Sequence, residues 1–210
     1  MVAVVSPAEP GAVRGREAGW GWTLLLPPGW ATIPSEPIAG RRAVTKLLDR
    51  RLAHLPRDRV VRLRRQLEAE LRGLVAQARE SGAGSLHAHL ALMRGLPVSA
   101  TCTPALLRGG PDDPRLLELL TTALDRDDDV VAVDVRPVAG LAAVRRRRHR
   151  LLPVEGTGRT VRSTSVDWAV PLPDGDGALL LSFATVTEPV AEELVLLFDA
   201  IAQSLELAPC

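Results

Sequence analysis

The last third of the chain contains four strand-length segments separated by short turns, and this pattern restricts the fold more than any other feature. The segments cover residues 129–136, 141–152, 160–170 and 178–187. Strands joined by such short turns pair antiparallel, because a parallel pair needs a crossover of a dozen or more residues. A closing helix over 190–205 carries apolar residues at three- and four-residue steps, and we expect it to cover the sheet.

The first two thirds of the chain add helices and further strands. The patterns predict a strand at 20–26, helices at 41–55 and 58–80, strands at 85–93 and 96–103, and a helix at about 113–125. Helices grouped in this way favour an α+β class over a doubly wound fold. We therefore expect a single, mostly antiparallel sheet of about six or seven strands, with two helices from the N-terminal half, a middle helix and a C-terminal helix packed on it.

The domain organisation predicted from the sequence is simple. Residues 1–18 mix Pro, Gly, Ala and Arg without periodicity and are predicted to form a flexible N-terminal arm. No long linker divides the remainder, so residues 19–208 are predicted to form a single α+β domain.

Composition restricts the class of protein further. An apolar fraction of 46% with 24% charged residues predicts a folded core. The two cysteines are too few for a disulfide framework, and the first residues lack the charged region of a secretory signal, so we expect a cytoplasmic protein with reduced thiols. No apolar run approaches the roughly 18 residues that cross a bilayer, which argues against membrane insertion. Lys46 is the only lysine, a bias typical of bacterial genomes rich in G and C.

Two segments resemble a known architecture. Residues 23–30 read TLLLPPGW, a strand that ends on a Pro-Gly-Trp corner, and the final strand leads through a short turn into a helix containing Phe198, Asp199 and Ile201. In these features the chain resembles Mog1/PsbP-like domains, especially uncharacterised actinobacterial members of the group. The resemblance implies a binding or accessory module, and it assigns no catalytic residue to this sequence.

Motifs for catalysis are sparse. The sequence contains no phosphate-binding loop, no dinucleotide fingerprint and no Gly-x-Ser-x-Gly elbow. His87 and His89 form a His-x-His pair on a predicted strand, and His149 is a candidate third ligand, so a zinc-dependent hydrolase is one alternative. The other interpretation of the pair is the polar face of a half-buried strand, without a cofactor.

Two charged runs are expected to neutralise each other. Residues 125–129 are mainly Asp, and residues 145–150 are five arginines and a histidine. A turn centred near Val138 would place Val131 opposite Arg145, Asp129 opposite Arg147 and Asp127 opposite His149, within about a residue. We expect these pairs to stabilise a hairpin, which explains the basic run better than a nucleic-acid patch does.

A second basic concentration has no such counterpart. Residues 41–65 contain ten of the 26 basic residues against two acidic ones, Asp49 and Asp58. Such a concentration on two neighbouring helices creates a field that attracts an acidic partner. The leading hypothesis is therefore a non-enzymatic module that binds an acidic protein, and a nucleic-acid-binding protein is a further alternative. The predicted partner-binding residues are Arg41, Arg42, Lys46, Arg50, Arg51, Arg57, Arg62 and Arg65.

Overall fold

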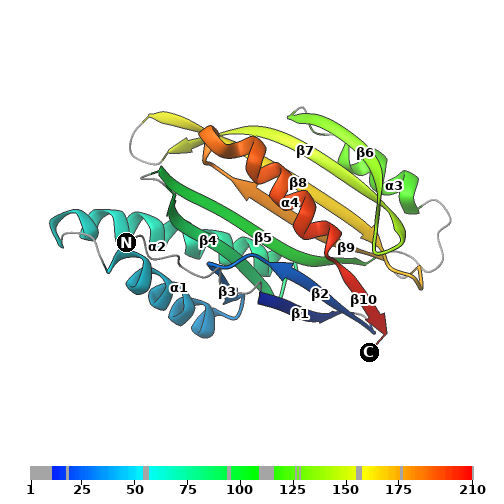
Figure 1. The fold of residues 1–210 in the computed structure, drawn as a ribbon, viewed down its shortest axis with the longest axis horizontal. Helices are drawn as coiled ribbons and strands as arrows, with labels where there is room; N and C mark the ends of the chain where they lie inside the picture. Colours follow the sequence, from blue (N-terminus) through cyan, green and yellow to red (C-terminus); the bar gives the residue numbers. More distant parts are fainter. Residues whose placement is uncertain are drawn as a thin grey trace, which may run out of the picture.

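The structure is a computed structural model that describes residues 11–17, 19–53, 57–93, 96–108, 116–125, 127, 129–154, 158–175 and 177–209. Within these residues the larger of two antiparallel sheets has seven strands (Figure 1). They are β3 (Trp30–Pro34), β4 (Ser85–Met93), β5 (Leu96–Arg108), β6 (Val130–Val138), β7 (Leu141–Val154), β8 (Arg159–Pro171) and β9 (Gly177–Thr185). Their order is β3-β4-β5-β9-β8-β7-β6. The strands from β6 to β9 each pair with the next in sequence, as their short turns require.

A second, smaller sheet corrects the expectation of a single one. In the described part of the chain it comprises β1 (Gly11–Glu17), β2 (Trp20–Leu26) and β10 (Glu206–Pro209), in the order β1-β2-β10. The two sheets separate at the turn after β2, where Gly29 has a φ of 93° that favours glycine. β3 starts after this turn and pairs with β4, so the chain leaves one sheet and enters the other.

The strand β1 also lies within the segment 1–18 that the sequence predicts as an arm. Gly11 to Glu17 pair with Leu26 to Trp20 in antiparallel register, so the predicted arm does not extend over these residues. Small side chains at Gly11, Ala12 and Gly15 explain why the sequence shows no strand periodicity there. Residues 1–10 lie outside the described part of the chain.

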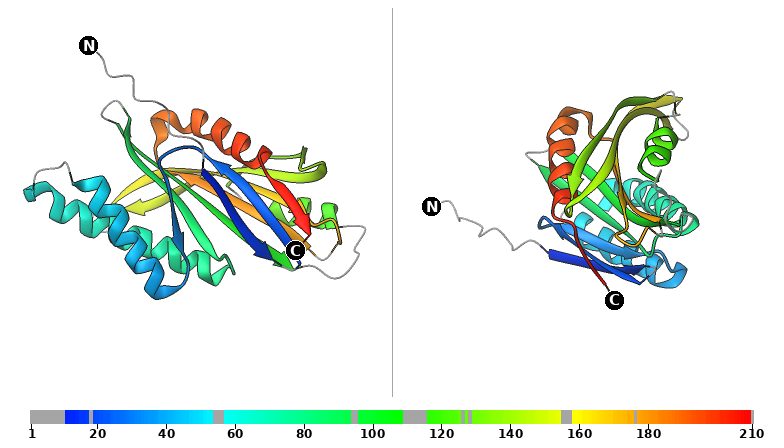
Figure 2. Two further views of the ribbon diagram at one scale, coloured as in Figure 1. Left: turned by 60° about the horizontal axis from the view of Figure 1, so that its bottom comes forward. Right: turned by 90° about the vertical axis from the view of Figure 1, so that its right-hand side faces the viewer.

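The helices pack on both faces of the seven-stranded sheet (Figure 2). They are α1 (Pro37–Leu52), α2 (Arg57–Glu80), α3 (Leu116–Leu124) and α4 (Ala191–Gln203). α4 covers one face, where Phe198 stacks on Phe183 at 5.2 Å. α1, α2 and α3 cover the other face, and adjacent residues of β8 divide between the two, since Trp168 faces α4 and Ala169 faces α3. The α+β class with antiparallel sheets is therefore confirmed.

The start of α1 is four residues earlier than the sequence predicts. Glu36 caps this helix because its carboxylate accepts from the backbone N–H groups of Ile38 and Ala39, at 3.0 and 2.6 Å, and Pro37 occupies the first turn. These contacts hold the pKa of Glu36 below its usual value, with Arg41 and Arg42 as weaker causes. The cap fixes where α1 begins, close to the end of β3.

The contact between α1 and β3 makes Gly40 a position that tolerates no side chain. A Cβ at Gly40 would lie 2.6 Å from the Pro34 carbonyl oxygen, whereas one at Gly73 of α2 would meet nothing within 4 Å. Gly40→Ala is therefore expected to lower the free energy of unfolding by about 1–3 kcal/mol. Gly73→Ala, the control, is expected to raise it by about 1 kcal/mol. Urea denaturation checks both, and a gain in stability at Gly40 would contradict the close packing of α1 on β3.

Candidate functional site

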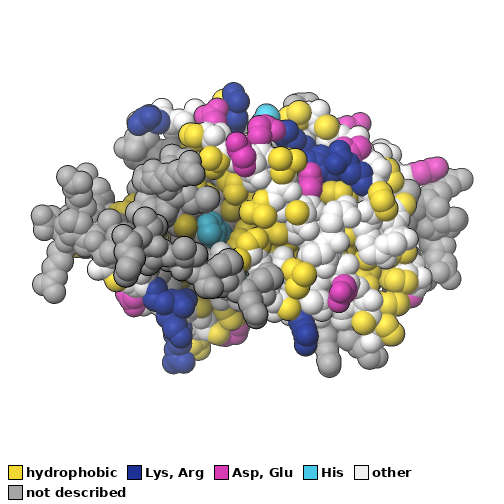
Figure 3. Space-filling view, in the orientation of Figure 1, with side chains coloured by type: hydrophobic (Ala, Val, Ile, Leu, Met, Phe, Trp, Pro, Cys, Tyr) yellow, Lys and Arg dark blue, Asp and Glu magenta, His cyan; other side chains and the backbone are white. Residues whose placement is uncertain are grey.

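The exposed face of α1 carries most of the basic residues predicted to bind a partner. The buried residues of this helix are Gly40, Val44, Leu47, Leu48 and Leu52. Because these positions face the core, the residues between them face solvent. Arg41, Arg42, Lys46 and Arg50 are exposed on this outer side, and Arg65 is exposed on α2. We call these five residues the basic surface, and Figure 3 shows Lys and Arg side chains gathered over α1 at its lower left.

Other basic residues from the same stretch already have partners in the chain. Arg64 of α2 forms an ion pair with Asp49 of α1 at 2.6 Å, which ties the two helices together. Arg51 donates to the carbonyl oxygen of Gly29 at 2.5 Å. Arg57 and Arg62 lie in α2, but their side chains are outside the described part of the structure. The predicted cluster therefore divides into a structural part and an exposed part.

A shallow depression lies within the basic surface. Arg41, Arg42, Thr45, Lys46 and Asp49 line it, and its volume is about 330 Å³. The recurrence of its residues at steps of three and four brings them together, because such positions are neighbours on one side of a helix. The depression therefore presents three cations and a hydroxyl group to solvent, together with a carboxylate that Arg64 already binds.

His87 is a buried side chain whose two ring nitrogens both have partners. The residue is 1% exposed, its Nδ1 lies 3.1 Å from the Thr32 hydroxyl, and its Nε2 lies 3.2 Å from the Ser85 hydroxyl. Burial lowers the pKa of His87 from 6.5 to about 4. His89, two residues on, is half-buried against the ring of Trp30, and burial followed by the charge of Arg51 lowers its pKa.

The structure does not bring the third predicted zinc ligand to this pair. His149 lies on β7, and three strands separate β7 from β4, which carries His87 and His89. At about 4.8 Å between neighbouring strands, the separation is roughly 19 Å, far beyond a shared coordination sphere. The predicted set of His87, His89 and His149 is therefore not one site, and no group of three or more metal-binding side chains occurs among the described residues.

The β6–β7 hairpin has a different register from the predicted one. Its turn is Ala139–Gly140, where both residues have positive φ (51° and 77°), as a two-residue hairpin turn requires. This turn pairs Asp134 with Arg145, whereas the sequence predicts Val131 there. The prediction was wrong by three residues at this point, because it placed the turn one to two residues too early.

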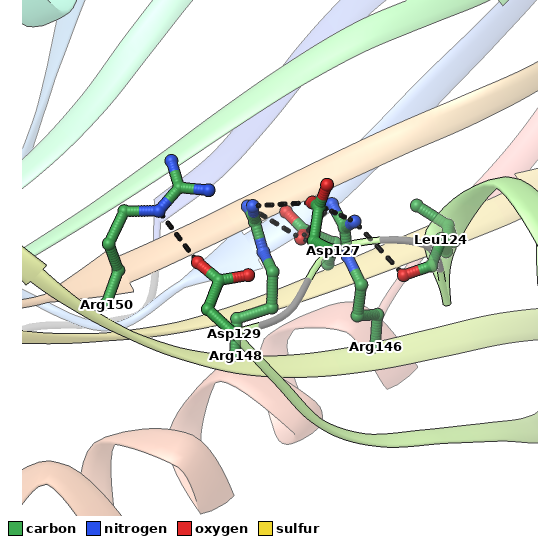
Figure 4. Close-up of polar contacts among 7 residues, drawn as sticks. Leu124, Asp127, Asp129, Arg146, Arg148 and Arg150 are labelled. Atoms are coloured by element: carbon green, nitrogen blue, oxygen red, sulfur yellow. Dashed lines mark hydrogen bonds and ion pairs between the residues drawn. The ribbon is translucent and has the colours of Figure 1, made fainter.

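The acidic and basic runs nevertheless neutralise each other, as Figure 4 shows. Asp127 lies 3.1 Å from Arg146 and 3.4 Å from Arg148, and Asp129 lies 2.7 Å from Arg150. Arg146 also donates to the Leu124 carbonyl oxygen at the C-terminal end of α3. The pairing therefore joins α3 to the sheet, and it accounts for much of the basic run without a ligand.

Two carboxylates that were not predicted from the sequence, Asp167 and Asp199, bind the most buried arginines. Asp167 of β8 accepts from Arg146 at 2.9 Å and lies 3.2 Å from Arg148, and its side chain is only 3% exposed. On the opposite face, Asp199 of α4 accepts from Arg145 at 2.8 Å and from the Trp168 indole at 3.2 Å. A lone charge in the apolar run 166–170 was the available signal for Asp167, since buried charges need partners.

These features define an antiparallel α+β protein with a basic helical surface and a neutralised charge network. No protein-family model matches the sequence, and no curated protein matches it. Among solved structures, the chain is similar to LpqN of Mycobacterium tuberculosis, a protein involved in cell envelope biogenesis. The TM-score is 0.49 with 11% sequence identity, over 96% of this chain and 93% of that chain. Among the described residues, no helix combines the length and apolarity needed to cross a membrane.

Proposed function

We propose that this protein is a non-enzymatic accessory module of the cytoplasm that binds an acidic protein partner through the basic surface. The observation that carries the proposal is the exposed row of cations on α1. Arg42 and Lys46 are exposed at a spacing of one helical turn, and no carboxylate of the described residues forms an ion pair with either. An acidic partner would supply the missing charges and would be attracted over a distance by the field of the row.

A protein partner explains the row better than a nucleic acid does. Residues 37–80, which include both α1 and α2, contain no Phe, Trp or Tyr. Proteins that bind single strands use aromatic side chains as stacking platforms, and readers of duplexes add side chains that contact base edges. The basic surface has the charge for a polyanion but lacks aromatic side chains for stacking, so a surface of carboxylates is the better match.

The proposal includes the Mog1/PsbP-like assignment made from the sequence. It is supported by the position of the resembling segments, since β2 ends at the Pro-Gly-Trp corner and β9 leads through a short 3-10 turn (Glu188–Val190) into α4. The zinc-dependent hydrolase is not favoured, because His87 has partners at both nitrogens and His149 lies on a distant strand.

Reversing two charges of the basic surface tests the proposed function. Arg42→Glu with Lys46→Glu is expected to weaken binding of a fluorescent acidic peptide of about 15 Glu residues by tenfold or more, because two attractive contacts become repulsive. Fluorescence anisotropy at low and moderate salt measures this binding, which should fall as salt rises. Arg136→Glu with Arg162→Glu changes the net charge equally at exposed residues of β6 and β8, and it serves as the control.

The same assay separates the alternatives. Equal peptide binding by both double variants would show that the basic surface is not the binding site. Tighter binding of a DNA or RNA oligonucleotide than of the peptide, lost on reversal at Arg42 and Lys46, would replace the proposed function with nucleic-acid binding.

A further inference from the structure

The depression on α1 offers more positive charge than a single carboxylate can neutralise. Arg41, Arg42 and Lys46 line it with exposed cationic side chains. Asp49, the acidic residue of the lining, is bound by Arg64 at 2.6 Å. Glu36 lies near Arg41 and Arg42 but accepts two backbone hydrogen bonds as the cap of α1. The depression is therefore left with about three positive charges and little compensation.

The hydroxyl group of Thr45 adds an uncharged donor to this lining. Thr45 is half-buried between the cationic side chains, one turn after Arg41. No side-chain hydrogen bond of Thr45 to another described residue is present in the structure. A threonine hydroxyl in the middle of a helix can bond to a backbone carbonyl four residues earlier, but here it is available to a ligand.

We propose that this depression binds a phosphoryl group carried by a serine or threonine side chain of the acidic partner. The inference rests on the proposed function and narrows the chemistry of the partner. A phosphoryl group carries a charge of about −1.5 to −2 and three acceptor oxygens, whereas a carboxylate carries one charge and two oxygens. Three cations and one hydroxyl group match the first better than the second. The volume of about 330 Å³ accommodates such a group together with water.

Four probes distinguish a phosphoryl site from simple charge attraction. They are an acidic peptide with one phosphoserine, a peptide of equal net charge in which two Glu residues replace it, the same peptide with unmodified Ser, and inorganic phosphate alone. Fluorescence anisotropy gives the affinities, with phosphate measured by competition. The phosphopeptide is expected to bind about tenfold more tightly than the charge-matched Glu peptide.

Thr45 provides a pair of matched variants. Thr45→Val keeps the shape of the side chain and removes the hydroxyl group. It is expected to weaken binding of the phosphopeptide about threefold to fivefold more than it weakens binding of the Glu peptide. Thr45→Ser keeps the hydroxyl group and is expected to retain the preference. Circular dichroism confirms that each variant is folded before its affinities are compared.

Each contrary outcome has a separate meaning. Equal binding of the phosphopeptide and the Glu peptide, lost from both in Arg42→Glu with Lys46→Glu, would overturn the phosphoryl inference and support the proposed function. Failure of every peptide to bind at low salt would overturn both. Inorganic phosphate that binds as tightly as the phosphopeptide would show a site for free phosphate, and it would overturn the claim that the partner carries the group.

Discussion

Asp167→Asn is expected to lower the free energy of unfolding by about 3–5 kcal/mol, the largest loss expected from a single polar substitution in this protein. Asp167 is 2% exposed and lies between two arginines, of which Arg146 has a side chain only 10% exposed. Without the charge of Asp167, these poorly hydrated guanidinium groups keep only one of their two carboxylate partners, Asp127. The cost is large because the remaining positive charges cannot regain water without disrupting β7 and β8.

Asp127 provides a closely matched control for Asp167. It contacts the same two arginines, but its side chain is 45% exposed. Asp127→Asn is therefore expected to cost less than about 1 kcal/mol, as for other exposed ion pairs. Chemical denaturation of both variants at neutral pH measures the difference, and similar losses would show that burial of the pair does not set its energy.

The second large effect is a loss of stability in mild acid caused by His87. The folded protein keeps His87 neutral down to about pH 4, whereas in the unfolded chain the same group takes up a proton near its ordinary value of 6.5. Between these values the unfolded state binds more protons, so the stability that His87 contributes is complete above pH 6.5 and is lost as the pH falls to about 4. At 1.36 kcal/mol for each pKa unit, the loss is about 3 kcal/mol.

A comparison of variants isolates this contribution from that of the carboxylates. His87→Gln removes the titrating group, and we expect it to be less stable than the native protein at pH 7, because the contacts to Thr32 and Ser85 change. That deficit should shrink by about 3 kcal/mol as the pH falls from 7 to 4. His149→Gln, at a much more exposed histidine, should show a far smaller change with pH. A deficit that is constant with pH at His87 would contradict the assignment.

The positions of the main elements could be predicted from the sequence because their signals are local. Polar and apolar residues alternate within each strand of the segment 129–187, and apolar residues recur at three- and four-residue steps within residues 58–80. The structure has strands and a helix at these positions. The strands β1, β3 and β10 were not predicted. β3 and β10 are short, with five and four residues, and they pair with strands more than 50 residues away in sequence.

The candidate site was predicted in part. The basic stretch 41–65 was visible as composition, but the sequence did not separate Arg42 and Lys46, which have no ion-pair partner among the described residues, from Arg51 and Arg64, which bind other groups of the chain. That separation depends on two tertiary contacts. The packing of α1 on α2 brings Arg64 to Asp49, and the position of the turn after β2 brings the Gly29 carbonyl oxygen to Arg51. Similarly, the His-x-His spacing was visible, but the burial of His87 depends on its neighbours in β3 and β5.

The sequence by itself determined the α+β class, the antiparallel pairing of the last four large-sheet strands and the presence of compensating charges in the hairpin. Short turns and periodic side chains impose these features within a few residues. Only the tertiary structure decided that the chain forms two sheets and that Asp167 and Asp199 form ion pairs with the buried arginines. It also decided which cations of α1 remain exposed. Those outcomes depend on contacts between residues far apart in the chain, and a shift of one residue in strand pairing would exchange the two faces of a strand.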